Sequence, residues 1–188
     1  MRIWVSLILI LFGCAASFAS DAALELSAAD GSTKKPLELN GAKAAVLIFY
    51  LHDCPICNTY APEIERIRGE YEAKGFTFYI VQTDPALKAE DAKKHAAEYG
   101  LKCSVLLDPA NRLAKLCGAT VTPEAAIVGV NAKVLYRGRI DDLFADYGKQ
   151  RAKATTRDLR AALDAVAEGK PAPPAGGAAV GCAIPLKR

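Results

Sequence analysis

The sequence predicts an α/β domain with a central mixed sheet and helices on both faces. Apolar, strand-like runs alternate along the chain with segments in which apolar residues recur every three or four positions. Such alternation is typical of strands and helices packed in layers. Two strand-like runs at 125–130 and 133–137 are joined by only two residues, which indicates an antiparallel hairpin and therefore a mixed sheet. The length of 188 residues suits one domain.

The individual elements follow from apolar runs and from the positions of glycine and proline. Ala45–Leu51 is a near-continuous apolar run and indicates a buried strand. From Pro55 to about Ala73 apolar residues recur at helical spacing, and Gly75 then ends the predicted helix. The other expected elements are edge strands at 24–26 and 37–39, strands at 76–82 and 104–107, and helices at 85–99, 110–117 and 155–168.

Residues 1–19 are interpreted as a signal peptide. Arg2 precedes an apolar run at 3–12, and small residues follow the run. The run is short for a membrane-spanning helix, and we expect cleavage after Ala19. A lipoprotein site is the alternative, because Leu-Phe-Gly is followed by Cys14; membrane attachment is expected only if Cys14 is lipidated. In both cases we expect export to the periplasm or another extracytoplasmic compartment, where disulfides can persist.

The exported part is expected to divide into one domain and a tail. Residues 24–168 hold all the predicted strands and helices. Residues 169–188 begin with a Pro- and Gly-rich stretch typical of a flexible tail and end in a segment that contains Cys182. The formal net charge of the chain is +3, with no basic block and no interleaving of aromatic and basic residues. No nucleic-acid partner is therefore expected.

A Cys-x-x-Cys motif, Cys54 to Cys57, stands where the predicted strand passes into the predicted helix. If the helix begins near Pro55, Cys54 occupies its N-cap, where unpaired backbone N–H groups and the helix dipole stabilise an anion. A thiolate in such a place has a lowered pKa. Cys57 faces the same side and can attack a mixed disulfide on Cys54. The spacing therefore predicts an exposed, activated thiol at Cys54 and a shielded, resolving thiol at Cys57.

The chain resembles the thioredoxin-like superfamily in the strand leading into CPIC, in the following APEIERI, and in the later VTPEAAIV. Within that superfamily it is most similar to the exported redoxins of the cytochrome-maturation and alkyl-hydroperoxide-reductase-like groups. The resemblance covers residues 24–168 and implies a thioredoxin-like fold. It also implies that Cys54 and Cys57 are catalytic, together with Pro123, a cis proline that lies against the active-site disulfide.

The implied function is that of an exported thiol–disulfide oxidoreductase. Its expected partners are protein disulfide or dithiol substrates, small thiols and a redox partner protein, and no cofactor or metal is expected. Thr122, Pro55 and His52 are expected to contribute to substrate binding. The Pro55-Ile56 dipeptide is neither of the pairs most associated with a strong reductant or a strong oxidant, so the direction of electron flow stays open.

Two other functions stay open as well. A thioredoxin-like copper chaperone would bind Cu(I) through Cys54 and Cys57, with His52 or Cys182 as a third ligand, although such chaperones typically have three residues between the cysteines. A peroxiredoxin-type peroxidase would use Cys54 to attack peroxide. That family has a threonine three residues before the cysteine, where this chain has Leu51.

The remaining cysteines and His95 allow further interpretations. The chain has six cysteines, and five without Cys14, so at least one thiol is free, bound or shared with a partner. Cys103 and Cys117 either form a disulfide or are two buried thiols. Cys182 lies in the apolar stretch GCAIP, which is typical of a docking segment; it can reach the catalytic pair, a partner or a metal, or be incidental. His95 lies in a polar helix and is expected at the surface.

Overall fold

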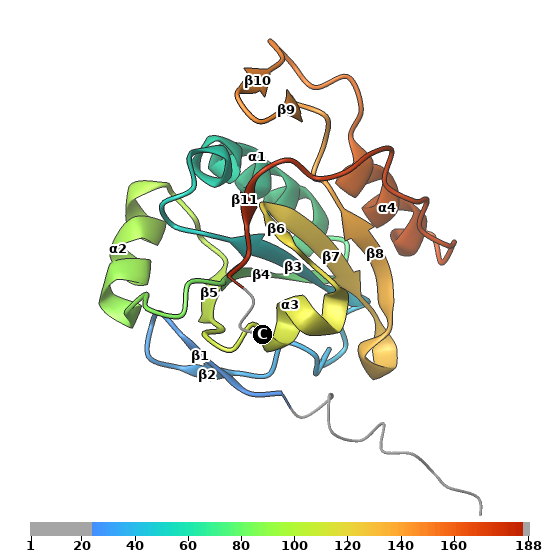
Figure 1. Cartoon of the computed structure of the whole chain (residues 1–188). Coiled ribbons are helices and arrows are strands. Elements are labelled where there is room, and N and C mark those ends of the chain that lie inside the picture. Colours follow the sequence, from blue (N-terminus) through green and yellow to red (C-terminus); the bar gives the residue numbers. More distant parts are fainter. Residues whose placement is uncertain (1–23, 186–188) are drawn as a thin grey trace, which may run out of the picture.

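The computed structural model describes residues 24–185, so the predicted signal peptide and Cys14 lie outside the described residues (Figure 1). The helices of this part are α1 (Pro55–Glu72), α2 (Ala89–Glu98), α3 (Arg112–Cys117) and α4 (Asp158–Ala167), with a 3₁₀ turn, η1 (Val130–Ala132). The strands are β1 (Leu26–Ala28), β2 (Thr33–Lys34), β3 (Ala44–Tyr50), β4 (Phe76–Gln82), β5 (Ser104–Leu107), β6 (Val121–Thr122), β7 (Glu124–Val128), β8 (Val134–Gly138), β9 (Phe144–Asp146), β10 (Lys149–Gln150) and β11 (Cys182–Ala183).

A seven-stranded mixed sheet forms the centre of the molecule, in the order β2-β1-β5-β4-β3-β7-β8. β3 runs parallel to β4, and β4 parallel to β5, as expected for strands joined through the helices α1 and α2. β7 is antiparallel to both of its neighbours, β3 and β8. The predicted closing hairpin and the mixed sheet are therefore confirmed. β9 with β10, and β6 with β11, form two further small sheets.

Strand β3 lies between two hydrophobic layers, which explains why its apolar residues do not alternate with polar ones. Ala44, Val46, Ile48 and Tyr50 belong to the core cluster that also contains buried residues of α1, α2 and α4. Leu47 and Phe49, on the other face, belong to a second cluster that contains residues of α3. Successive side chains of a strand point to opposite faces. The predicted α/β class, with helices on both faces of the sheet, is confirmed.

Helix α1 follows directly from the periodicity of its apolar residues. Its buried side chains include Ile56, Tyr60, Ile64, Ile67 and Tyr71, which form one stripe against the sheet. Burying each of these large side chains stabilises the fold by roughly 1.5–3 kcal/mol. The helix ends just before Gly75, whose φ of +93° is a conformation that favours glycine. The apolar stripe starts at Ile56, directly after Pro55, so the helix begins at the Cys-x-x-Cys motif.

Short strands differ most from the prediction. The strand expected at 37–39 is wrong, because β1 pairs instead with Thr33–Lys34, in the register Leu26 to Lys34. The hairpin of β9 and β10 and the pairing of β6 with β11 are also new. A strand of two or three residues has too little sequence to show a period, so its partner decides whether it forms.

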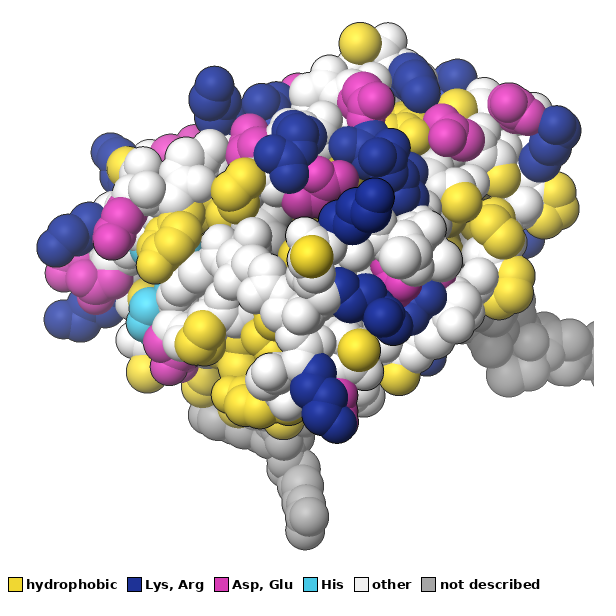
Figure 2. All heavy atoms as spheres, turned by 90° about the horizontal axis from the view of Figure 1, so that it is seen from above, with side chains coloured by type: hydrophobic (Ala, Val, Ile, Leu, Met, Phe, Trp, Pro, Cys, Tyr) yellow, Lys and Arg dark blue, Asp and Glu magenta, His cyan; other side chains and the backbone are white. Residues whose placement is uncertain are grey.

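Charged side chains of both signs share the surface. Figure 2 shows Lys and Arg interspersed with Asp and Glu over one face of the molecule. Among the ion pairs, Arg68 Nε lies 2.8 Å from Glu65 Oε2, and Arg160 Nη2 lies 3.2 Å from Glu63 Oε1. Between residues 24 and 185, no helix has both the length and the apolar character that crossing a membrane requires.

Candidate active site

Cys54 lies at the start of α1, as predicted. It is the N-cap residue, with extended backbone angles (φ −82°, ψ 115°), and Pro55 follows at the first helical position. Proline suits this position because its missing N–H would have no partner within the helix. The Cys54 N–H donates to the Leu51 carbonyl oxygen at 3.1 Å, and the Cys54 carbonyl oxygen accepts from the Asn58 N–H at 3.1 Å. This turn holds the Cys54 sulfur at the positive end of the helix dipole.

The second cysteine of the motif lies beside the first. Cys54 and Cys57 are 3.7 Å apart. Cys57 is completely buried. Its burial, followed by the hydrogen bond to Cys54 and the charge there, raises the pKa of the Cys57 thiol well above its ordinary value. Cys57 is therefore shielded from solvent and protonated.

The end of β6 brings a cis proline to the same place. The Thr122–Pro123 peptide bond is cis, and both residues are buried. The Cys54 sulfur lies 3.6 Å from the Thr122 carbonyl oxygen, to which it donates when the thiol is protonated. The fold thus joins the two motifs on which the resemblance rested, although 68 residues separate them in the chain.

A third cysteine reaches this site from β11. Cys182 is paired with Thr122 in the antiparallel β6–β11 ladder, and the Thr122 hydroxyl donates to the Cys182 carbonyl oxygen at 3.3 Å. The Cys182 side chain lies beside the Cys54 sulfur, close enough to affect its ionisation. Only 1% of the Cys54 surface is exposed. The expectation of an exposed Cys54 is therefore wrong for this arrangement of the chain, in which the C-terminal segment lies against it.

These contacts stabilise a thiolate on Cys54. A hydrogen bond from the Cys57 side chain, opposed by burial and reinforced by hydrogen bonds from Cys182 and from both backbones, lowers the pKa of Cys54 from 9.0 to about 5. Burial, followed by the hydrogen bond to Cys54, raises the pKa of Cys182 to about 12. At neutral pH the cluster therefore holds one anion, on Cys54, and two thiols that donate to it. The helix N-terminus favours the same charge state.

The alkylation rate of reduced Cys54 is expected to depend on pH as that of a thiol with a pKa of about 5 does. Because only the thiolate is alkylated, the rate should rise as the pH passes through about 5 and change little above neutral pH. The measurement is iodoacetamide labelling, with each cysteine quantified by peptide mass spectrometry. Cys182→Ala should move the midpoint upward because it removes a donor, while Cys117→Ala should not. A midpoint near 9 in the unaltered protein would contradict the geometry.

His52 lies next to the motif, but its ring faces α2. His52 Nδ1 lies 3.7 Å from Asp84 Oδ2, and the ring is edge-on to that of His95, with 6.2 Å between centroids. No interaction of the His52 ring with a cysteine is found among the described residues. His95 is 8% exposed and its Nε2 is 2.9 Å from Asn58 Oδ1, so the expected surface position of His95 is wrong.

Asn58 supports the site, and no sequence pattern indicated it. Its Nδ2 donates to the His52 carbonyl oxygen at 3.2 Å, and its Oδ1 accepts from Tyr50 Oη at 2.9 Å. The side chain thereby connects the end of β3, the loop that follows and the first turn of α1. The only signal in the sequence was its place directly after Cys57.

Cys103 and Cys117 are two separate buried thiols. Both are free, and they belong to different core clusters on opposite faces of the sheet. Burial raises the pKa of each thiol to about 12. Of the two interpretations that the sequence allowed, the disulfide is therefore wrong and the pair of buried thiols is confirmed.

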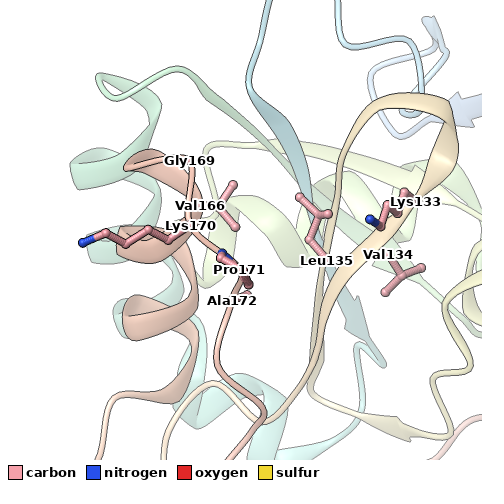
Figure 3. Close-up of a pocket in the computed structure, with 8 residues that line it drawn as sticks. All are labelled: Lys133, Val134, Leu135, Val166, Gly169, Lys170, Pro171 and Ala172. Atoms are coloured by element: carbon pink, nitrogen blue, oxygen red, sulfur yellow. The ribbon is translucent and has the colours of Figure 1, made fainter.

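Two other features of the described residues do not add to this site. Between residues 24 and 185, no three or more His, Cys, Asp and Glu side chains are grouped as metal ligands would be. A hollow of about 450 Å³ lies between β8 and the end of α4 (Figure 3). Leu135 and Val166 face each other across it, whereas Lys170 points away. The residues drawn around this hollow include no predicted site residue.

Comparison with solved structures identifies thioredoxin-like relatives. A hypothetical protein of Sinorhizobium meliloti 1021 is 25% identical, with a TM-score of 0.75 over 87% of this chain and 91% of that one. An uncharacterised conserved protein of Geobacillus kaustophilus is 28% identical, with a TM-score of 0.71 over 88% and 90%. A candidate thiol:disulfide interchange protein DsbE of Chlorobium tepidum is 27% identical, with a TM-score of 0.52 over 61% and 78%.

Comparison of the sequence with protein families agrees with the fold. No curated protein sequence matches the chain. The family model described as Redoxin matches residues 15–150, which is more than half of the chain and includes both the Cys-x-x-Cys motif and the Thr-Pro pair. With the thioredoxin-like structural neighbours, this match shows that the chain belongs to the redoxin family, within the thioredoxin-like superfamily.

Proposed function

We propose that this protein is an exported thiol–disulfide oxidoreductase, which exchanges disulfides with protein or small-thiol substrates through Cys54 and Cys57. The observation that carries the proposal is the pairing, at one helix N-terminus, of a thiol with a pKa of about 5 and a buried, protonated thiol. Membership of the redoxin family and the similarity to a candidate thiol:disulfide interchange protein support this class of reaction.

The two cysteines would act in sequence. The Cys54 thiolate attacks a substrate disulfide, forms a mixed disulfide and releases one substrate thiolate, which takes up a proton. Cys57 then loses its proton and attacks the Cys54 sulfur, which releases the second substrate thiol and leaves a Cys54–Cys57 disulfide. The substrate gains two electrons and the protein loses them. Run in reverse, the same steps oxidise a substrate dithiol.

Neighbouring residues would bind the substrate beside the Cys54 sulfur. The Thr122 carbonyl oxygen contacts that sulfur, and we expect the neighbouring Pro123 and the exposed Pro55 to form the walls of the binding groove. The half-exposed His52 would contact the substrate from the loop before the helix. Export remains part of the proposal, on the basis of the basic and apolar sequence at residues 1–19.

A mixed disulfide trapped on Cys54 tests this function. The double variant Cys57→Ser/Cys182→Ser removes both thiols that contact Cys54, so nothing nearby can resolve an adduct. With oxidised glutathione it should accumulate one glutathione on Cys54, at neutral pH and under native conditions. Intact-mass and peptide mass spectrometry measure the adduct and its position.

The matched control adds Cys54→Ser to the same double variant, which leaves the buried Cys103 and Cys117 and should give no adduct within the described residues. Failure of the double variant to form the adduct, while its circular dichroism stays native, would overturn the proposed function. If glutathione were added to Cys103 or Cys117 as fast as to Cys54, Cys54 would not be specially reactive.

A further inference from the structure

The C-terminal segment returns to the active site along a defined path. After α4 it crosses toward β6, where β11 lies alongside (Figure 1). The Gly176 N–H donates to Asp158 Oδ1 at 2.5 Å, and Asn111 Nδ2 donates to the Pro185 carbonyl oxygen at 3.3 Å. Ile184 is buried in the core cluster below the sheet, and its N–H donates to the Thr120 carbonyl oxygen at 2.9 Å. The segment is thus held on both sides of Cys182.

Gly181 allows the backbone before β11 to approach the backbone of β6 at Thr122. A Cβ atom at Gly181 would lie 1.9 Å from the Thr122 carbonyl oxygen and 3.2 Å from the Pro123 nitrogen. No side chain fits such a gap, so glycine is required where two backbones meet in this way. The close approach occurs one residue before Cys182, and it sets the depth at which that cysteine enters the site.

As a result, the Cys54 sulfur has two thiol neighbours. Cys57 lies 3.7 Å from Cys54 on the helix, and Cys182 comes from β11, where it is paired with the Thr122 whose carbonyl oxygen contacts the Cys54 sulfur. Either sulfur must move closer to Cys54 to reach the S–S bond length of about 2.05 Å, and for Cys57 that movement starts from 3.7 Å. The neighbours differ in exposure, because Cys57 is completely buried and Cys182 is partly exposed.

Building on the function proposed above, we propose that Cys182 is a third redox-active thiol, which resolves disulfides on Cys54 in competition with Cys57. In the Cys54–Cys57 disulfide, the Cys182 thiol loses its proton and its sulfur attacks Cys54. A Cys54–Cys182 bond forms, the Cys54–Cys57 bond breaks, and Cys57 leaves as a thiolate that takes up the proton. No electrons are gained or lost, so no further reactant is needed.

This exchange would also control access to the site. A Cys54–Cys182 disulfide would fix β11 on β6 and keep Thr122 and Pro123 covered. A substrate disulfide can reach Cys54 only after β11 has moved, since Cys54 is 1% exposed with β11 in place. Attack of a reducing thiol on the partly exposed Cys182 sulfur would break that bond and release the segment. Cys182 would then both resolve disulfides on Cys54 and hold β11 on β6.

The test compares two variants that differ only at position 182. Both Cys57→Ser and Cys57→Ser/Cys182→Ser are treated with oxidised glutathione, and the adduct on Cys54 is followed by mass spectrometry. Glutathione should leave Cys54 at least about 100-fold faster in the single variant than in the double variant, because the attack by Cys182 is intramolecular. The product should be a Cys54–Cys182 disulfide, identified as a linked peptide pair.

The outcomes separate this inference from the function on which it rests. An adduct that persists equally in both variants overturns the role of Cys182 and leaves the thiol–disulfide function standing. No adduct in either variant, and no linked peptide, overturns both. A Cys54–Cys182 linkage that forms only after unfolding in denaturant also overturns the inference, because the docked β11 is its basis. Cys57→Ser/Cys103→Ala, which removes a remote thiol, should behave as Cys57→Ser does.

Discussion

Cys54→Ser is expected to lower disulfide-exchange activity by at least about 10³-fold. A serine hydroxyl keeps its proton at neutral pH and forms no disulfide, so no mixed disulfide can arise at this position. The assay is reduction of oxidised glutathione or of a protein disulfide by the reduced enzyme, followed as thiol release. The substitution changes one buried atom and should leave the fold intact.

The matched control is Cys117→Ala. Cys117 is also a buried cysteine, but it packs in the second core cluster against the opposite face of the sheet. Its removal should leave the exchange rate unchanged and lower thermal stability modestly, through the small cavity it creates. Equal activity of Cys54→Ser and the unaltered protein would remove Cys54 from the reaction altogether.

The long elements of the fold could be predicted because each carries its own periodicity. Strand β3 was recognisable from an unbroken apolar run, and its burial on both faces explains that run. Helix α1 was recognisable from Ile56 through Tyr71, with Pro55 marking its start and Gly75 its end. The position of Cys54 followed from those signals, since a helix that begins at Pro55 leaves the preceding residue as its N-cap.

The short elements could not be predicted, for a physical reason. β6 and β11 have two residues each, and each forms because the other is present. The Thr122 and Cys182 that pair there are 60 residues apart. GCAIP looked like a docking segment because it is apolar, but nothing local identifies its docking position. Gly181 read alone is another turn-forming glycine, and only the nearby Thr122 carbonyl oxygen shows why it is needed.

The pKa of Cys54 depends on a local feature, the helix N-terminus, and on a contact with a distant part of the chain. Its place at a helix N-terminus, readable from the sequence, predicts a lowered pKa. A further lowering of the pKa comes from Cys182, at the far end of the chain. On the function proposed above, the same contact would favour the thiolate and limit its access to substrates. Cys54 would then react only in proportion to the time that β11 spends away from β6.

Gly181→Ala should strongly increase the fraction of molecules in which β11 is detached from β6, called the open form. A Cβ 1.9 Å from the Thr122 carbonyl oxygen forces the two backbones apart, which frees Ile184 from the core. Loss of that burial, worth roughly 1.5–3 kcal/mol, corresponds to an open population roughly 10- to 100-fold larger. Alkylation of Cys54, measured at a pH where it is fully ionised, should accelerate by that factor. The Ile184 amide should also lose protection from hydrogen exchange.

Gly69→Ala is the matched control, because a Cβ at Gly69 has no atom within 4 Å. Alanine at this position in the last turn of α1 should raise stability by up to about 1 kcal/mol and leave the alkylation rate of Cys54 unchanged. If Gly181→Ala leaves both Cys54 reactivity and Ile184 protection as they were, β11 does not cover the site in solution. If protection is lost and reactivity is unchanged, β11 docks but does not limit access to Cys54, and control of the site must come from the Cys54–Cys182 bond alone.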